Sequence, residues 1–239
     1  MSFSGWSLPP IHKEGYRFIA IFAGVTLLLF MMSSFLGWIG VILTLWCVAF
    51  FRDPDRVGPT NPDVVIAPAD GVVCAVDQVP PPAELEMGDE PVARVGIFMN
   101  VFNVHVNRSP AAGTIGRIAY RPGLFLNAST DKSSTDNERC AYRLDLDDGR
   151  SLAFTQIAGL VARRIVWHVS EGDEIGRGER FGLIRFGSRM DVYFPKGVTP
   201  IVEVGQTMLS GETVLASLNT AEHPPIPLPD ASDSDDEGA

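Results

Sequence analysis

The chain has 239 residues and a formal net charge of −10, from 29 Asp and Glu against 19 Lys and Arg. Six of the acids and none of the bases lie in residues 221–239, which leaves 23 acids against 19 bases, a net of −4, in the rest of the chain. The body therefore has neither the basic stripe typical of a nucleic-acid partner nor the clustered cysteines or histidines of a disulfide scaffold or zinc site.

The first element is an apolar segment, Phe18–Phe51, of 34 residues without a charged side chain. As one helix it would be about 51 Å long, whereas the hydrocarbon core of a bilayer is about 30 Å thick. Ser33, Ser34 and Gly37 interrupt the run near its middle, which favours two shorter helices. Basic residues flank both of its ends: Lys13, Arg17, Arg52 and Arg56. We therefore predict that residues 1–52 form a membrane-anchoring helical hairpin, spanning or re-entrant, in the inner cell membrane, with the domain that follows on the cytoplasmic face.

The chain beyond residue 52 changes to short runs of β-forming residues separated by Gly, Pro and Asp. Runs of this length and spacing predict a mainly β domain, an antiparallel sandwich or barrel, over residues 53–220. No long amphipathic helical period is present there. The Pro-rich and then acidic sequence of residues 221–239 predicts a disordered tail.

Two segments of this domain match each other in sequence. Gly172–Glu179 and Gly205–Glu212 share the pattern G-x-x-[IM]-x-x-G-E at an offset of 33 residues. Each copy is predicted to form a glycine-held turn that leads into a strand. The spacing resembles the swapped-hairpin hybrid motif of biotinyl and lipoyl carriers, which is a likeness of topology and not of function.

Three positions on different predicted β segments carry groups that can react together. Asp70 lies at a turn before an apolar run, and His105 lies between two valines in an alternating segment. Gly187-Ser188 interrupts two β-forming runs and places a hydroxyl directly after a flexible glycine. An aspartate can orient an imidazole, and an imidazole can take a serine proton. The order Asp, His, Ser alone does not distinguish this chemistry from ordinary turns and structural residues.

Four further stretches, taken together with the apolar N-terminus, carry a family resemblance. They are FFRDPDR at 50–56, APADGVV at 67–73, FMNVFNVHVNRSP at 98–110 and VSEGDEIGRGERFGLIRFGSRMDVYFP at 169–195. Together they resemble the phosphatidylserine decarboxylase proenzymes, and in particular the short bacterial (type A) branch of that family. The resemblance covers about residues 50–218, and the block around Gly187-Ser188 is its most specific part.

The resemblance implies that the chain cuts itself between Gly187 and Ser188. By this analogy His105 deprotonates the Ser188 hydroxyl, with Asp70 behind it, and the hydroxyl oxygen attacks the Gly187 carbonyl. The ester that forms undergoes elimination, and hydrolysis with loss of ammonia leaves a pyruvoyl group at position 188.

The implied products are a β chain of residues 1–187 and an α chain of residues 188–239, paired as a heterodimer or in a higher oligomer. The pyruvoyl group made from Ser188 would be a covalent cofactor, and no metal is expected. The resemblance implies that its ketone forms a Schiff base with the serine amine of phosphatidylserine in the bilayer. Loss of carbon dioxide then yields phosphatidylethanolamine.

The chain departs from longer members of the family, which carry two nearby histidines, the second for the decarboxylation proton step. Asn103 occupies the neighbouring polar position here. The proton step is therefore open between a second use of His105, recruitment of His168, and a relay that includes Asn103. Three arginines are candidates for holding the substrate phosphate or carboxylate: Arg108, Arg185 and Arg189.

Two other functions stay open on sequence grounds. One is a membrane-anchored carrier or scaffold without enzymatic activity, although the bend at Gly187-Ser188 lacks the exposed lysine of a lipoyl carrier, and the nearest lysine is Lys196. The other is a pyruvoyl decarboxylase that acts on a different serine phospholipid.

Overall fold

The fold is given by a computed structural model that describes residues 8–124, 137–159, 164–185 and 188–219. Gly187 and the predicted tail of residues 221–239 lie outside these ranges. The chain divides into two compact units, residues 1–55 and residues 56–239. The first unit is helical and the second is built from strands.

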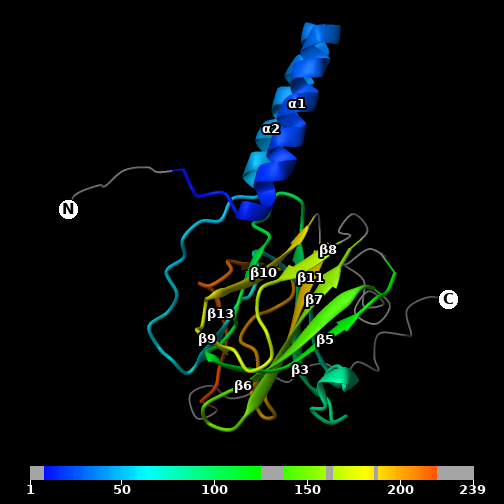
Figure 1. Ribbon diagram of the computed structural model, residues 1–239. Helices are drawn as coiled ribbons and strands as arrows, with labels where there is room; N and C mark the ends of the chain where they lie inside the picture. Colours follow the sequence, from blue (N-terminus) through cyan, green and yellow to red (C-terminus); the bar gives the residue numbers. More distant parts are fainter. Residues whose placement is uncertain (1–7, 125–136, 160–163, 186–187, 220–239) are drawn as a thin grey trace, which may run out of the picture. The chain divides into compact units, whose positions relative to one another are not determined.

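The first unit contains two apolar helices joined at a single residue (Figure 1). A 3-10 turn, Lys13–Gly15, leads into α1, Tyr16–Met32, and α2 follows at Ser34–Phe50. Ser33 between them is extended, and its hydroxyl caps α2 by accepting a hydrogen bond from the Phe35 backbone nitrogen at 3.3 Å. The interruption that the sequence predicts in the apolar run therefore lies at Ser33.

The two helices contact each other through small and hydroxyl-bearing residues. The hydroxyl oxygens of Thr26 and Thr44 lie 3.0 Å apart, and Thr26 packs against Gly40, where a side chain would not fit. The outward faces instead expose large apolar side chains: Ile21, Val25, Leu27, Leu28, Met31, Met32, Phe35, Trp38, Ile42 and Leu45. The helical stretch Lys13–Met32 is long and apolar enough to cross a membrane, and α2 is a shorter apolar helix.

The second unit is mainly β, as predicted (Figure 1). Its strands are β1 (Val64–Ile66), β2 (Gly71–Val79), β3 (Val92–Met99), β4 (Val106–Arg108), β5 (Gly113–Arg121), β6 (Arg139–Asp145), β7 (Ser151–Ala158), β8 (Arg164–Trp167), β9 (Glu174–Ile175), β10 (Arg180–Arg185), β11 (Ser188–Tyr193), β12 (Thr207–Met208) and β13 (Val214–Ser217). A 3-10 turn, η2 (Ala83–Leu85), lies between β2 and β3. Every strand pair in the described ranges is antiparallel, which confirms the predicted class.

Eight strands form one curled sheet in the order β12-β2-β3-β11-β7-β6-β5-β9. A smaller sheet has the order β4-β10-β8, and β1 pairs with β13. Side chains from both larger sheets meet in the core, where the rings of Tyr142, Phe154 and Phe181 pack at centroid distances of 4.9 to 5.2 Å. The strand β11 lies in the middle of the large sheet, paired with β3 and β7 along its whole length.

The internal repeat is present as two turns with matching main-chain hydrogen bonds. Residues 172–178 bond to residues 109–115 in the same way as residues 205–211 bond to residues 67–73. The matching bonds run from Gly178 to Ser109 and from Gly211 to Ala67, from Gly172 to Ile115 and from Gly205 to Val73, and from Ile115 to Asp173 and from Val73 to Gln206. The segments APADGVV and SPAAGTI at 67–73 and 109–115 are thus a second repeat, which the sequence interpretation missed. The likeness to a hybrid motif stays a prediction.

Candidate active site

Ser188 is the first residue of β11 and pairs with Met99 of β3 and Ala158 of β7. Because side chains alternate along a strand, Ser188 shares the core face of the sheet with Met190 and Val192. Ser188 is fully buried, and its hydroxyl has no hydrogen-bond partner among the residues that the structure describes. Leaving a buried hydroxyl unpaired costs about 1–3 kcal/mol, so a purely structural serine is not expected to be kept in this state.

A row of residues, called here the Ser188 row, crosses the large sheet. On one side of Ser188 lies Met99, and Gly71 of β2 follows by continuation of the β2–β3 register. On the other side lies Ala158, whose backbone nitrogen donates to the carbonyl oxygen of Glu138 at 2.9 Å. Since neighbouring strands are about 4.8 Å apart, Gly71 and Glu138 lie about 10 Å from Ser188 on opposite sides.

Asp70 precedes Gly71 and places a nearly buried carboxylate at one end of the Ser188 row. One guanidinium nitrogen of Arg56 contacts both of its oxygens, at 2.7 and 3.0 Å. The backbone nitrogen of Ser210 donates to the same carboxylate at 2.8 Å. These bonds fix the carboxylate in one orientation, and the sequence interpretation did not include Arg56 among the site residues.

The second copy of the repeat shows what the Asp70 turn needs in order to form. Ala112 occupies the position that corresponds to Asp70, and the main-chain hydrogen bonds around the two turns match. The turn therefore forms without an acid. This supports a chemical rather than a structural reason for Asp70.

His105 is buried in the loop between β3 and β4, and the main chain fixes its ring. Nδ1 lies 2.9 Å from the carbonyl oxygen of Asn103. A carbonyl oxygen can only accept, so Nδ1 carries the hydrogen, and Nε2 is the basic nitrogen of the neutral ring. The carbonyl of His105 accepts from the Ile184 backbone nitrogen at 3.3 Å. His105 thus lies beside the segment that leads directly to Gly187.

Asn103 and His168 differ in how they relate to this centre. Asn103 contacts His105 through its backbone, and its side-chain oxygen accepts from the Asn100 backbone nitrogen at 2.8 Å. His168 is exposed and follows the end of β8 that is remote from the residue paired with Arg185. His168 is about 13 Å along the strand from Arg164, the residue that pairs with Arg185. The structure therefore brings Asn103 to His105 but does not bring His168 there.

The three candidate arginines are nearly buried, each at most 9% exposed. Arg189 lies on the face of β11 opposite to Ser188, and its Nε donates to Asp191 at 2.5 Å. Arg108 donates to a backbone carbonyl at 3.0 Å, and Arg185 ends β10. Contact of these three arginines with a substrate stays a prediction, and the ion pair favours a structural role for Arg189.

Arg189 belongs to a buried ion network behind the strand that starts at Ser188. Asp191 also accepts from Arg94 at 3.4 Å, and Arg94 pairs with Asp77 at 2.5 Å. Burial opposes the charge of Arg94, but Asp191 and Asp77 outweigh it and raise the pKa of Arg94 above its ordinary value. The sequence could have indicated this network only through Arg189 and Asp191, which alternate on one face of a strand. Nothing in the sequence marked Asp77 on β2 or Arg94 on β3 as their partners.

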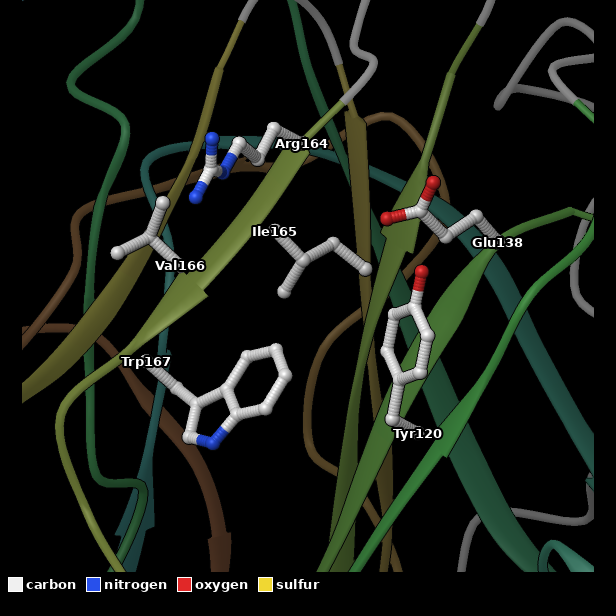
Figure 2. Close-up of a pocket in the computed structure, with 6 residues that line it drawn as sticks. All are labelled: Tyr120, Glu138, Arg164, Ile165, Val166 and Trp167. Atoms are coloured by element: carbon white, nitrogen blue, oxygen red, sulfur yellow. The ribbon is translucent and has the colours of Figure 1, made fainter.

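A pocket of about 410 Å³ opens beyond the Ala158 side of the Ser188 row (Figure 2). Residues of β8 line one side of it, and a residue of β5 and the residue before β6 line the other: Arg164, Ile165, Val166, Trp167, Tyr120 and Glu138. Figure 2 shows the Tyr120 hydroxyl pointing toward the Glu138 carboxylate. The rings of Tyr120 and Trp167 stack at a centroid distance of 5.8 Å. The sequence interpretation did not identify this pocket, because strands far apart in the chain build it.

Within the part of the chain that the structure describes, no three His, Cys, Asp or Glu side chains are grouped so that they could hold a metal ion. The reactive groups at this end of the sheets are the hydroxyl of Ser188, the imidazole of His105 and the carboxylate of Asp70. Arg56 is bound to that carboxylate. This set can deprotonate a hydroxyl and stabilise the cation that results.

Comparisons with known proteins agree with the family resemblance. The family model described as phosphatidylserine decarboxylase matches residues 43–216. A phosphatidylserine decarboxylase proenzyme from Cereibacter sphaeroides is 60% identical over 90% of this chain and 93% of its own length. Proteins of the same name from Ruegeria pomeroyi (58% identical, 88% of this chain and 96% of that protein) and Paramagnetospirillum magneticum (56% identical, 89% of each) are similar over nearly their whole lengths.

Proposed function

The chain belongs to the phosphatidylserine decarboxylase family and is a carboxy-lyase, and we propose that it becomes active by cutting itself between Gly187 and Ser188. The observation that carries this proposal is the Ser188 hydroxyl, which is fully buried and lacks a hydrogen-bond partner among the described residues. No group in the described part of the chain therefore engages its lone pairs. The relatives are named as proenzymes, which is consistent with such a step.

Cleavage begins when Nε2 of His105 takes the proton of the Ser188 hydroxyl. The oxygen attacks the Gly187 carbonyl carbon, the peptide C–N bond breaks, and the Gly187 acyl group becomes an ester on Ser188. Elimination releases the Gly187 carboxylate and leaves dehydroalanine at 188. Its imine tautomer takes up water and loses ammonia, which leaves a pyruvoyl group at the start of β11.

Asp70 acts in this proposal through its negative charge. The charge stabilises the imidazolium that forms when His105 has taken the proton. Because Nδ1 of His105 bonds to Asn103, the effect acts through space rather than through a direct bond to that nitrogen. Arg56 holds the Asp70 carboxylate in position.

The surroundings of Ser188 fit a pyruvoyl group. The position is enclosed, its own oxygen is not paired within the described residues, and its neighbours in the sheet are Met99 and Ala158. At this position the group would supply a ketone that can condense with an amine and accept the electrons released with carbon dioxide, which is the chemistry that decarboxylation of phosphatidylserine to phosphatidylethanolamine needs. The chain itself contributes position, because β3 and β7 hold β11 from both sides.

The two products of cleavage are proposed to stay together as a heterodimer. The α chain, residues 188–239, begins with β11, and both neighbours of that strand belong to the β chain, residues 1–187. Main-chain hydrogen bonds on both sides of β11 support this association.

We also propose that residues 1–52 anchor the enzyme in the cell membrane, with the catalytic domain, residues 53–220, on the cytoplasmic face. The apolar length of Lys13–Met32 and the exposed apolar faces of α1 and α2 support the anchor. The anchor would keep the catalytic domain at the membrane surface, where a lipid substrate remains in the bilayer.

Denaturing mass spectrometry of the purified chain tests the proposal. We expect two wild-type species, residues 1–187 and residues 188–239 with pyruvoyl in place of Ser188, and one uncut 25.9 kDa species for Ser188→Ala. We expect His105→Ala to stay largely uncut, whereas His168→Ala, which removes the same residue type far from Ser188, is cut normally. An intact wild-type chain that decarboxylates phosphatidylserine would sink the pyruvoyl mechanism, and an intact inactive one would favour the scaffold alternative.

A further inference from the structure

The pocket beside the Ser188 row contains charged groups that self-cleavage does not use. Glu138 and Arg164 carry opposite charges and line different sides of it (Figure 2). Arg164 is exposed and makes no ion pair or side-chain hydrogen bond within the described ranges. A cation of this kind at the opening of a pocket is available to a ligand.

The register of the large sheet places Glu138 in line with Ser188. Ser188 pairs with Ala158, and the backbone nitrogen of Ala158 donates to the carbonyl oxygen of Glu138. Residues directly opposite each other on neighbouring strands point to the same face of a sheet, so Glu138 and Ser188 share a face. Only the methyl group of Ala158 lies between them in the row, across a separation of about 10 Å.

The small sheet brings the opposite wall of the pocket to the same place. Ile165 of β8 pairs with Ile184 of β10, and the Ile184 backbone nitrogen donates to the His105 carbonyl. Ile165 is therefore two strands from His105, as Glu138 is two strands from Ser188. Both walls of the pocket thus lie two strands from the reacting residues, one wall in each sheet.

We propose, on the basis of the decarboxylase function proposed above, that this pocket receives the charged headgroup of the substrate, with its ammonium facing Glu138 and its phosphate facing Arg164. Glu138 lies in the Ser188 row, and the amine is the group that must reach position 188. Arg164 is exposed at the edge of the pocket. It is assigned to the phosphate because the phosphate is the part of the headgroup nearest to the acyl chains. A guanidinium is suited to phosphate because it donates two parallel hydrogen bonds.

The remaining side chains of the pocket support this orientation. The Tyr120 hydroxyl points toward the Glu138 carboxylate (Figure 2), and burial, the charge of Glu138 and a hydrogen bond to it together raise the pKa of Tyr120. The stacked rings of Tyr120 and Trp167 give an aromatic wall, on which a cation is attracted. Neither charged residue is assigned to the substrate carboxylate, which must lose its charge as carbon dioxide leaves.

Steady-state kinetics of the processed, detergent-solubilised enzyme on phosphatidylserine test the assignment. We expect Arg164→Gln to raise KM about tenfold with kcat nearly unchanged, because the phosphate contact is the same in the ground and transition states. We expect Glu138→Gln to lower kcat/KM about tenfold through poorer placement of the amine. The exposed ion pair Arg117–Glu86 supplies matched controls, Arg117→Gln and Glu86→Gln, which should leave both constants unchanged.

Two soluble inhibitors separate the roles of the two residues. Glycerol 3-phosphate offers phosphate alone, so Arg164→Gln should weaken its inhibition about tenfold and Glu138→Gln should not. Glycerophosphoethanolamine offers phosphate and ammonium, so both variants should weaken it. Equal inhibition of wild type and both variants by both compounds, with unchanged kinetic constants, would overturn the proposal.

Mass spectrometry of the same samples distinguishes this failure from failure of the proposed function. Variants that are fully cut and carry pyruvoyl have folded and matured, so their kinetic constants report on the pocket alone. A cut, active wild type with unaffected pocket variants refutes only the headgroup site. An uncut or inactive wild type refutes the function on which it rests.

Discussion

Arg56 is the residue that most extends the predicted Asp–His–Ser set. It directly follows the boundary of the second unit, and its guanidinium reaches Asp70 with both side chains largely shielded from water. An ion pair in this setting fixes geometry more than it adds stability. Arg56 is therefore expected to matter for the rate of maturation.

We predict that Arg56→Gln slows self-cleavage at least about tenfold, because a carboxylate left without its partner moves and stabilises the imidazolium of His105 less well. Arg56→Lys should restore part of the rate, since it keeps the charge but loses the planar guanidinium. Gel analysis of the precursor over time measures both. Arg121→Gln, at a 64% exposed side chain, is the control, and equal half-times for all four chains would contradict the role.

The sequence alone was sufficient to propose Asp70, His105 and Ser188, because their residue types lie in stretches that resemble a known family. It did not reveal Arg56, which reaches Asp70 through a side-chain ion pair from an irregular segment, or Glu138, which the register between β6 and β7 places in the Ser188 row. Asn103 was singled out as a departure in the proton step. The structure adds that its carbonyl oxygen fixes the tautomer of His105. Because this contact is made by the backbone, the side chains in the sequence do not predict it.

At the scale of elements, the repeated glycine turns hold the ends of β2 and β5 in place. Gly205 has a φ of +93° with no atom near its missing Cβ, so only backbone strain would oppose a side chain there. Gly176 lies inside the other copy without a positive φ. An alanine at Gly205 would add backbone strain, whereas an alanine at Gly176 would only reduce chain flexibility, so a comparison of the two variants measures the strain.

We predict that Gly205→Ala lowers the free energy of unfolding by about 1–2 kcal/mol, the cost of a left-handed L-residue. Gly176→Ala should stay within about 0.5 kcal/mol of the parent. Urea unfolding in the uncut Ser188→Ala background gives both values for a single chain. A loss at Gly176 as large as that at Gly205 would show that strain at positive φ is not the cause.

The first repeat was predictable because its copies share two glycines and a glutamate at the same spacing, with an apolar residue at a fourth position. The segments to which it bonds were not recognised as a repeat, since APADG and SPAAG share mostly small residues that occur in many turns. The helical interruption at Ser33 was predictable from length against bilayer thickness. The strand order was not, because antiparallel pairing between distant segments leaves no local signal.

At the scale of the whole molecule, the position of β11 sets how the mature enzyme can fold. The strand is paired on both sides, yet by the proposed cleavage it would belong to a separate chain. Once unfolded, the two chains must find each other by diffusion. Folding of the precursor requires no such encounter.

We predict that the uncut Ser188→Ala chain refolds from denaturant, in detergent, with a yield independent of protein concentration at low micromolar levels. The processed wild type should refold with a lower yield that falls on dilution, because association of two chains is bimolecular. Recovery of the native far-ultraviolet spectrum across a dilution series measures this. Concentration-independent recovery of the processed enzyme would mean that the α chain is not needed to complete the sheet.

The two equivalent turns have the same backbone hydrogen bonds, but only one of them carries an acid: Asp70 in the first and Ala112 in the second. Changing Asp70 to alanine would give the first turn the sequence APAAG, against SPAAG in its counterpart, which already folds. The turn itself therefore does not require the acid, whereas Arg56 and the Ser210 backbone nitrogen do lose a partner when it is removed. One turn thus serves the scaffold alone, while its counterpart also holds the acid that is proposed to assist self-cleavage.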